Sequence, residues 1–198
     1  MDVTRMKAGA LVLLVALAGC AGKDFVRPGP DAFKLGETSY AHVVQQLGEP
    51  RKSGDVLKND KTLKTITYVY ASSASEPSEA GVIPARGLTY YFYEDKLVGE
   101  EFLSSFKADS SNFDETRVES IRKGETTRVQ VIQALGTPTA SFVPPITKSS
   151  AGETIGYGYT AVRGGLFSGF KTFVKSLRVS FDDSGLVSEV DYSSAGNR

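Results

Sequence analysis

Few side chains in this 198-residue chain could do chemistry, and they form no recognisable catalytic set. His42 is the only histidine and Cys20 the only cysteine, so an internal disulfide, a cluster of thiolates or a pair of histidine ligands cannot form. The acidic pairs Glu94-Asp95, Glu100-Glu101 and Asp182-Asp183 lie in or next to expected hairpin turns, where turn chemistry accounts for them. The sequence therefore predicts no catalytic residue, no metal site and no cofactor. The enzymatic alternative is hydrolysis by two carboxylates brought together from distant segments.

Cys20 has the clearest chemical assignment. An apolar run at residues 8–17 follows two basic residues, and it has the length of a signal-peptide core but is too short to span a bilayer. The run leads into Leu17-Ala18-Gly19-Cys20, which resembles the lipobox of bacterial lipoproteins. That resemblance implies cleavage between Gly19 and Cys20 and attachment of acyl chains such as palmitate to Cys20. More than one chain gives stable anchoring. The alternative is a cysteine buried in a core strand.

The residue after the cysteine bears on the compartment. Lipoproteins retained in the inner membrane often carry Asp there, whereas this chain has Ala21, so the resemblance implies the outer membrane, facing the periplasm. Loss of Arg5, Lys7 and Asp2 with the leader lowers the 23 basic and 23 acidic side chains to 21 and 22. A nearly neutral chain has no field of one sign to attract nucleic acid.

A stretch that occurs twice organises the rest of the chain. Residues 36–50 and 124–138 are identical at 8 of 15 positions, at a constant offset of 88. In both copies an apolar stripe at helical spacing predicts a short helix. We expect Thr38 and Thr126 to cap the helix N-termini, and Gly48 and Gly136, each followed two residues later by proline, to end the helices.

Each repeated helix is followed by strand patterns. Residues 66–70, 88–92 and 97–100 alternate in the manner of strands and have counterparts at 155–159, 177–181 and 186–189. A further helix is expected at residues 112–123, capped by Asn112. Residues 72–87 are rich in Ser, Glu, Pro and Gly and are expected to form a mobile loop.

These patterns predict an α+β fold of two tandem units, each a helix hairpin packed on a three-stranded antiparallel sheet. The expected boundaries are a signal peptide at 1–19, the lipidated cysteine and a tether at 20–32, a first unit at 33–107 and a second at 108–195. The pattern leaves open whether the two sheets join edge to edge.

The order G-x-T, helix, L-G-x-P and three strands resembles the BamE (SmpA/OmlA) family of outer-membrane lipoproteins. The resemblance covers residues 33–106 and 114–194, and it implies an accessory role in the machinery that inserts β-barrel proteins. BamE has one such unit. Two in tandem resemble the β-lactamase inhibitor protein, which shares the unit and clamps another protein. The sequence departs from several BamE-like sequences in lacking an acidic residue just after each threonine at 38 and 126.

Aromatic residues are the candidates for protein binding. Tyr91 and Tyr93 fall on the strand face opposite the expected core, whose counterpart in the second repeat is polar, and tyrosine supplies anchor area at interfaces. Leu166, Phe167 and Phe170 lie among glycines at an expected hairpin tip, where they either fold back on the sheet or touch a partner or lipid headgroups. Cross-strand pairing of exposed rings is the alternative for the tyrosines.

The sequence thus favours a non-enzymatic lipoprotein of the cell envelope that binds another envelope protein as an outer-membrane assembly or stabilising factor, with the β-barrel assembly machinery as the candidate partner. Membrane attachment is through the N-terminal lipid, and no nucleic acid is involved. The alternative is an inhibitor-like module that clamps a soluble periplasmic or secreted protein.

Overall fold

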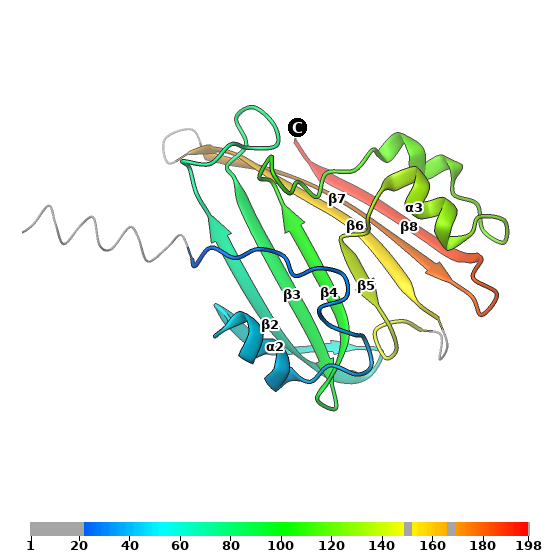
Figure 1. Ribbon diagram of the computed structural model, residues 1–198. Helices are drawn as coiled ribbons and strands as arrows, with labels where there is room; N and C mark the ends of the chain where they lie inside the picture. Colours follow the sequence, from blue (N-terminus) through cyan, green and yellow to red (C-terminus); the bar gives the residue numbers. More distant parts are fainter. Residues whose placement is uncertain (1–21, 149–151, 166–168, 198) are drawn as a thin grey trace, which may run out of the picture.

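The computed structural model describes residues 22–148, 152–165 and 169–197, and they form one eight-stranded antiparallel sheet (Figure 1). The strands lie in the sheet in chain order, each paired with the next. They are β1 (Lys52–Lys58), β2 (Lys61–Ala71), β3 (Ala85–Tyr93), β4 (Lys96–Ser104), β5 (Ala140–Phe142), β6 (Thr154–Gly165), β7 (Gly169–Phe181) and β8 (Val187–Gly196).

The expected α+β fold of two tandem units, each a helix hairpin on a three-stranded antiparallel sheet, is therefore wrong. Two strands that were not expected, β1 and β5, account for the difference. The three-residue β5 pairs with β4 on one side and with β6 on the other, so it joins the two halves of the chain into one sheet. So short a strand is stabilised by pairing with its neighbours and not by the strand propensity of its own residues, so its sequence alone does not predict it.

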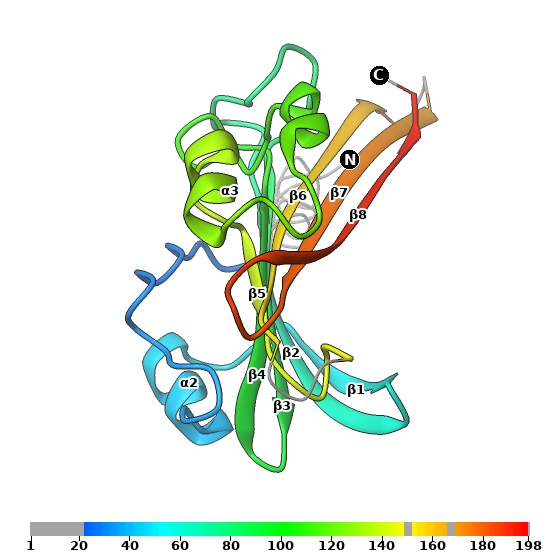
Figure 2. The same cartoon turned by 90° about the vertical axis from the view of Figure 1, so that its right-hand side faces the viewer.

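The helices are fewer and shorter than expected. The repeated stretches form α2 (Tyr40–Leu47) and α3 (Arg128–Leu135), both on the same side of the sheet (Figure 2). Residues expected to form a helix at 112–123 instead give a short 3₁₀ helix, η1 (Glu115–Ser120), capped by Asp114 and not by Asn112. Within the described ranges no helix hairpin precedes α2.

The expected N-caps are displaced by one residue. The side chains of Ser39 and Thr127 accept the capping hydrogen bonds from the N–H groups of His42 and Gln130. The hydroxyls of Thr38 and Thr126 are already used, because they accept from Lys34 N and Arg122 N, each at 2.8 Å, in the turn before the helix. Two adjacent hydroxyl residues serve two different turns, a distinction that residue type alone does not show.

Gly48 and Gly136 lie at the C-caps of α2 and α3. Their dihedral angles are φ 79°, ψ −171° and φ 84°, ψ −166°. This conformation combines a positive φ with an extended ψ, so it differs from the left-handed helical conformation common in glycines that end helices. It is essentially restricted to glycine.

The same tertiary contacts recur in the two halves. The Tyr68 hydroxyl donates to Gly48 O at 2.8 Å, and the Tyr157 hydroxyl donates to Gly136 O at 2.9 Å. The first bond fixes the end of α2 to β2, and the second fixes the end of α3 to β6. Val43 of α2 and Val131 of α3 are fully buried at the centres of two apolar clusters on this side of the sheet.

The segment expected to be a tether lies along the sheet instead. Residues 22–35 cross β2 to β4 on the side that carries the helices (Figure 1). Phe25 packs near Tyr68, and Phe33 contacts the Tyr90 ring edge-on at 5.5 Å between centroids. Burial of two aromatic rings stabilises the docked segment by about 2–4 kcal/mol.

The β2–β3 connection is also packed. Val82 is buried against Tyr159, Ala161 and Phe173 of the second half. The Ser78 hydroxyl lies 2.8 Å from the Tyr159 hydroxyl. The expected mobile loop therefore covers the ends of β6 and β7.

Candidate binding surface

The side of the sheet opposite α2 and α3 presents the remaining side chains of each strand, because successive residues point to opposite faces. We call this surface the open face. Figure 2 shows the helices on one side, with the β1–β2 hairpin and the upper ends of β6 to β8 extending toward the other. From the pairing register, the open face is made of Thr65 and Thr67 of β2, Thr89 and Tyr91 of β3, Glu101 and Leu103 of β4, Phe142 of β5, Gly156 and Gly158 of β6, Ser176, Arg178 and Ser180 of β7, and Glu189 and Asp191 of β8.

Strand glycines at the centre of the open face leave room for larger side chains nearby. A Cβ at Gly158 would lie 2.6 Å from Leu103 Cδ2, and one at Gly99 would lie 2.7 Å from both Ile146 Cδ1 and Phe142 Cδ1. Leu103 of β4, Phe142 of β5 and Ile146 of the loop after β5 therefore lean over the glycines. The result is an apolar strip between the halves of the sheet, in which Phe142 and the glycines are buried.

Small hydroxyl residues flank this strip. The Thr67 and Thr89 hydroxyls are 3.1 Å apart on β2 and β3. The Thr154 and Ser180 hydroxyls are 2.8 Å apart on β6 and β7. Each pair satisfies one hydrogen bond and keeps acceptor capacity for a bound molecule.

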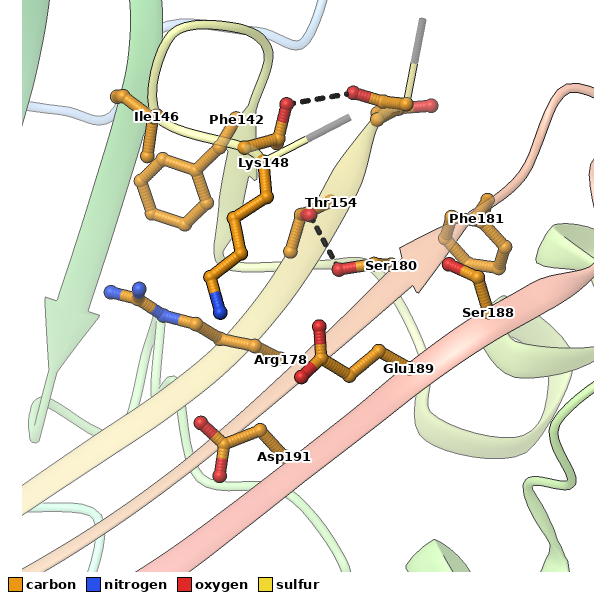
Figure 3. Close-up of a pocket in the computed structure, with 13 residues that line it drawn as sticks. Phe142, Ile146, Lys148, Thr154, Arg178, Ser180, Phe181, Ser188, Glu189 and Asp191 are labelled. Atoms are coloured by element: carbon orange, nitrogen blue, oxygen red, sulfur yellow. Dashed lines mark hydrogen bonds between the residues drawn. The ribbon is translucent and has the colours of Figure 1, made fainter. Parts of the chain in front are cut away.

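A cavity of about 290 Å³ lies at the β8 end of the open face. Its walls include Phe142, Ile146, Lys148, Arg178, Glu189 and Asp191 (Figure 3). In Figure 3 the side chains of Lys148, Arg178 and Glu189 point into the same space. The Arg178 guanidinium carbon lies 5.0 Å from the Phe142 ring centroid, which is a cation–π contact.

The lining of this cavity is chemically mixed. It offers charges of both signs and an aromatic wall, but no histidine or cysteine. Across the parts of the chain that the structure describes, no group of three His, Cys, Asp or Glu side chains could hold a metal. His42 itself is exposed on α2, with the Phe33 ring 6.0 Å away.

Tyr91 lies on the open face, but it is half-buried and not a freely exposed anchor. Its ring meets Phe142 at 6.0 Å between centroids, and its hydroxyl donates to Glu101 Oε2 at 3.3 Å. Burial, with a smaller contribution from the Glu101 carboxylate, raises the pKa of Tyr91 to about 12. Tyr91 therefore contributes to the packing between β3 and β5. Tyr93 is half-buried near the Lys61 ammonium, 5.9 Å from the ring centroid.

The remaining predicted residues are placed only in part. Phe170, at the start of β7, is 61% exposed. Leu166 and Phe167 lie outside the described residues, as do Gly19 and Cys20. No helix in the described ranges is long and apolar enough to span a membrane.

Sequence reasoning missed Phe142, Arg178, Glu189 and Asp191. The grouping of Arg178 with the other three depends on β5, which was not expected. Alternation of acidic and apolar residues at 189–192 was the available signal.

Comparison with known proteins gives little further information. No family model matches the chain, and no curated protein matches it. Among solved structures it is similar to one described as a "putative beta-lactamase inhibitor protein" from Streptococcus mutans, with 14% identity and a TM-score of 0.40 over 92% of this chain and 96% of that one. Membership in the BamE (SmpA/OmlA) family receives no direct support from these comparisons.

Proposed function

We propose that this protein is a non-enzymatic lipoprotein of the cell envelope, anchored through Cys20 to the outer membrane on the periplasmic side, that binds another envelope protein through the open face. The observation that carries the binding role is the open face itself. Within the described residues, no helix covers that side of the sheet.

The size of the open face favours a protein over a small molecule. Eight strands spaced about 4.8 Å apart give a width of roughly 34 Å, enough for a folded partner. The surface combines an apolar strip, hydroxyl groups and the half-buried Tyr91 with charge at its β8 end. Protein interfaces combine these same elements, with an apolar centre and a polar rim.

The partner proposed from the sequence is an outer-membrane assembly component, with the β-barrel assembly machinery as the candidate. In the inhibitor-like alternative, the open face would bind and clamp a soluble periplasmic or secreted protein. The lipid anchor favours a partner in the outer membrane, because holding both proteins at the same membrane raises their effective concentration for each other.

The anchor is tested by replacing its attachment residue. Cys20→Ala should move the protein from the membrane fraction to the soluble fraction, because the described part of the chain has no spanning helix to hold it. A Cys20→Ala protein that stays full length in the membrane fraction would contradict the anchoring proposal.

Binding is tested by chemical crosslinking in native membranes, followed by mass spectrometry of what is captured. Barrel-assembly components among the captured proteins support the proposal, and a soluble partner in their place supports the inhibitor-like alternative. Turnover of an ester, peptide or glycan panel by the soluble protein would instead show an enzyme.

A further inference from the structure

The two edges of the sheet differ in how they are protected. Edge strands expose unpaired backbone groups, and proteins commonly block them with lysine, proline or strong twist. β1 carries Lys52 and Lys58 at its ends and Gly54 between them. β8, with the sequence VSEVDYSSAG, contains no lysine, arginine or proline. The β8 edge therefore lacks the usual obstacles to pairing.

The outer side of β8 is unpaired over most of its length. At its start, Val187 N donates to Thr126 O, and Gly124 N donates to Val187 O, so the loop before α3 covers this one position. From Ser188 to Gly196 the described chain places no backbone partner on the outer side. Residues 191–196 are all exposed.

The direction of the unused N–H groups follows from the register. Asn197 N donates inward to Thr172 O of the β7 side, and alternate residues of an antiparallel strand point the same way. Ser193 and Ala195 thus face β7, whereas Tyr192 and Ser194 present their N–H groups outward. β4 shows the same alternation of N–H direction along a strand. Ser105 N, just past its end, donates toward β3, to Ala85 O, and Phe102 N donates toward β5, to Thr139 O.

The side chains along this edge specify the chemistry of a partner. Glu189 and Asp191 stand on the open face, both exposed. Arg178 is the cross-strand neighbour of Asp191, but its guanidinium lies against the Phe142 ring. On the other face Tyr192 meets Phe113 edge-on at 6.5 Å between ring centroids. On β8 itself, one face therefore carries two carboxylates and the other is apolar, while the cations Lys148 and Arg178 stand across the cavity from the carboxylates.

A second copy of this chain is disfavoured in the register centred on Val190. Antiparallel pairing of two β8 strands about Val190 would place Glu189 of each opposite Asp191 of the other, and like charges directly opposite are destabilising. A segment with lysine or arginine at alternate positions and apolar residues between them would instead complement both faces.

We propose that β8 binds its partner by strand addition, taking an extended basic segment whose backbone pairs with Ser188–Gly196 and whose lysine or arginine side chains meet Glu189 and Asp191 beside the cavity. The proposal rests on the protein-binding function above and names its mode and the chemistry of the segment. Main-chain hydrogen bonds give such complexes affinity, and alternate side chains give them specificity.

The backbone part is tested with a matched pair of variants. Ser194→Pro removes an outward N–H and leaves the inward ladder to β7 intact, since proline is tolerated on an edge with its nitrogen toward solvent. Ser194→Ala keeps the N–H. The probe is a synthetic peptide alternating lysine with valine and threonine, and binding is followed by amide chemical shifts. Wild type and Ser194→Ala should show shifts confined to β8, and Ser194→Pro should bind about tenfold more weakly or worse.

The charge part is tested by exchange. The double variant Glu189→Lys, Asp191→Lys should lose the lysine peptide and gain the same peptide with glutamate in place of lysine. Equal binding of both peptides by wild type, shifts outside β8, or unchanged binding by Ser194→Pro would each overturn strand addition. Far-ultraviolet circular dichroism and melting checks that each variant is folded.

Capture in membranes separates this proposal from the function on which it rests. If Ser194→Pro captures the same envelope protein as wild type, strand addition is wrong and the binding function stands. If wild type binds the lysine peptide but captures no partner in membranes, the β8 edge can bind a basic strand and the proposed envelope function is wrong.

Discussion

Tyrosine hydroxyls fix both repeated helices to the sheet. Tyr68 and Tyr157 donate to the carbonyls of the glycines that end α2 and α3. The repeat in the sequence places these tyrosines on equivalent strands, 89 residues apart, but it does not show that their hydroxyls reach back to the C-caps. That bond depends on the helix lying across its own sheet, which is a tertiary property.

The ionisation of these tyrosines predicts alkaline unfolding. Burial is the largest cause that raises the pKa of both Tyr68 and Tyr157 from 10.0 to about 12. The folded state therefore holds the phenolic protons more tightly than the unfolded state. The contribution of these two groups to the free energy of unfolding should thus be constant below pH 10 and fall between pH 10 and 12. Urea unfolding across this range measures it.

The matched variants Tyr68→Phe and Tyr157→Phe should each lower the free energy of unfolding by about 1 kcal/mol at neutral pH. Each should also reduce the alkaline fall. A pH profile that is the same in wild type and both variants would show that other groups control alkaline unfolding.

Tyr91 and Tyr93 are predicted to behave differently, although they share a face. Tyr91→Ala removes the contact with Phe142 and the hydrogen bond to Glu101, so it should destabilise by about 2 kcal/mol. Tyr93→Ala should cost no more than about 1 kcal/mol, since its ring has the Lys61 contact and no hydrogen bond from its hydroxyl among the described interactions. Melting temperatures of the two single variants decide this, and equal losses would contradict the assignment of Tyr91 to the packing between β3 and β5.

Elements were predictable where local chemistry defines them. The glycine–proline endings and apolar stripes located α2 and α3, and alternation located β2, β3, β4, β6, β7 and β8. β1 was missed because residues 52–58 contain three charged side chains and a glycine, and β5 because three residues carry no periodicity. The helix expected at 112–123 fails because η1 buries none of its own residues.

The glycine caps give a prediction at the scale of the helix. Gly136→Ala places a Cβ on a backbone with φ 84° and ψ −166°, so α3 should end differently and stability should fall by about 1–3 kcal/mol. Gly29→Ala is the matched control, because no atom lies within 4 Å of its added Cβ and its φ is not in the positive range. Equal melting temperatures for the two variants would contradict the role of Gly136.

The whole molecule is one sheet with a covered side and an open side. The internal repeat is visible in the sequence, and its two halves make equivalent contacts, but the union of their strands is not visible. That union depends on β5 fitting between β4 and β6, with Gly99 and Gly156 opposite Phe142 and Ala140. The open face, and the acidic edge at its end, exist only in the joined sheet.

A photo-crosslinking amino acid placed at one position at a time tests this account most directly, in cells that make the full-length chain. Arg178 reports on the open face beside β8, and His42, exposed on α2, reports on the covered side. The account predicts one discrete membrane-associated adduct from position 178 and none from position 42. An adduct of the same protein from position 42 alone would show that the helices, and not the open face, meet the partner.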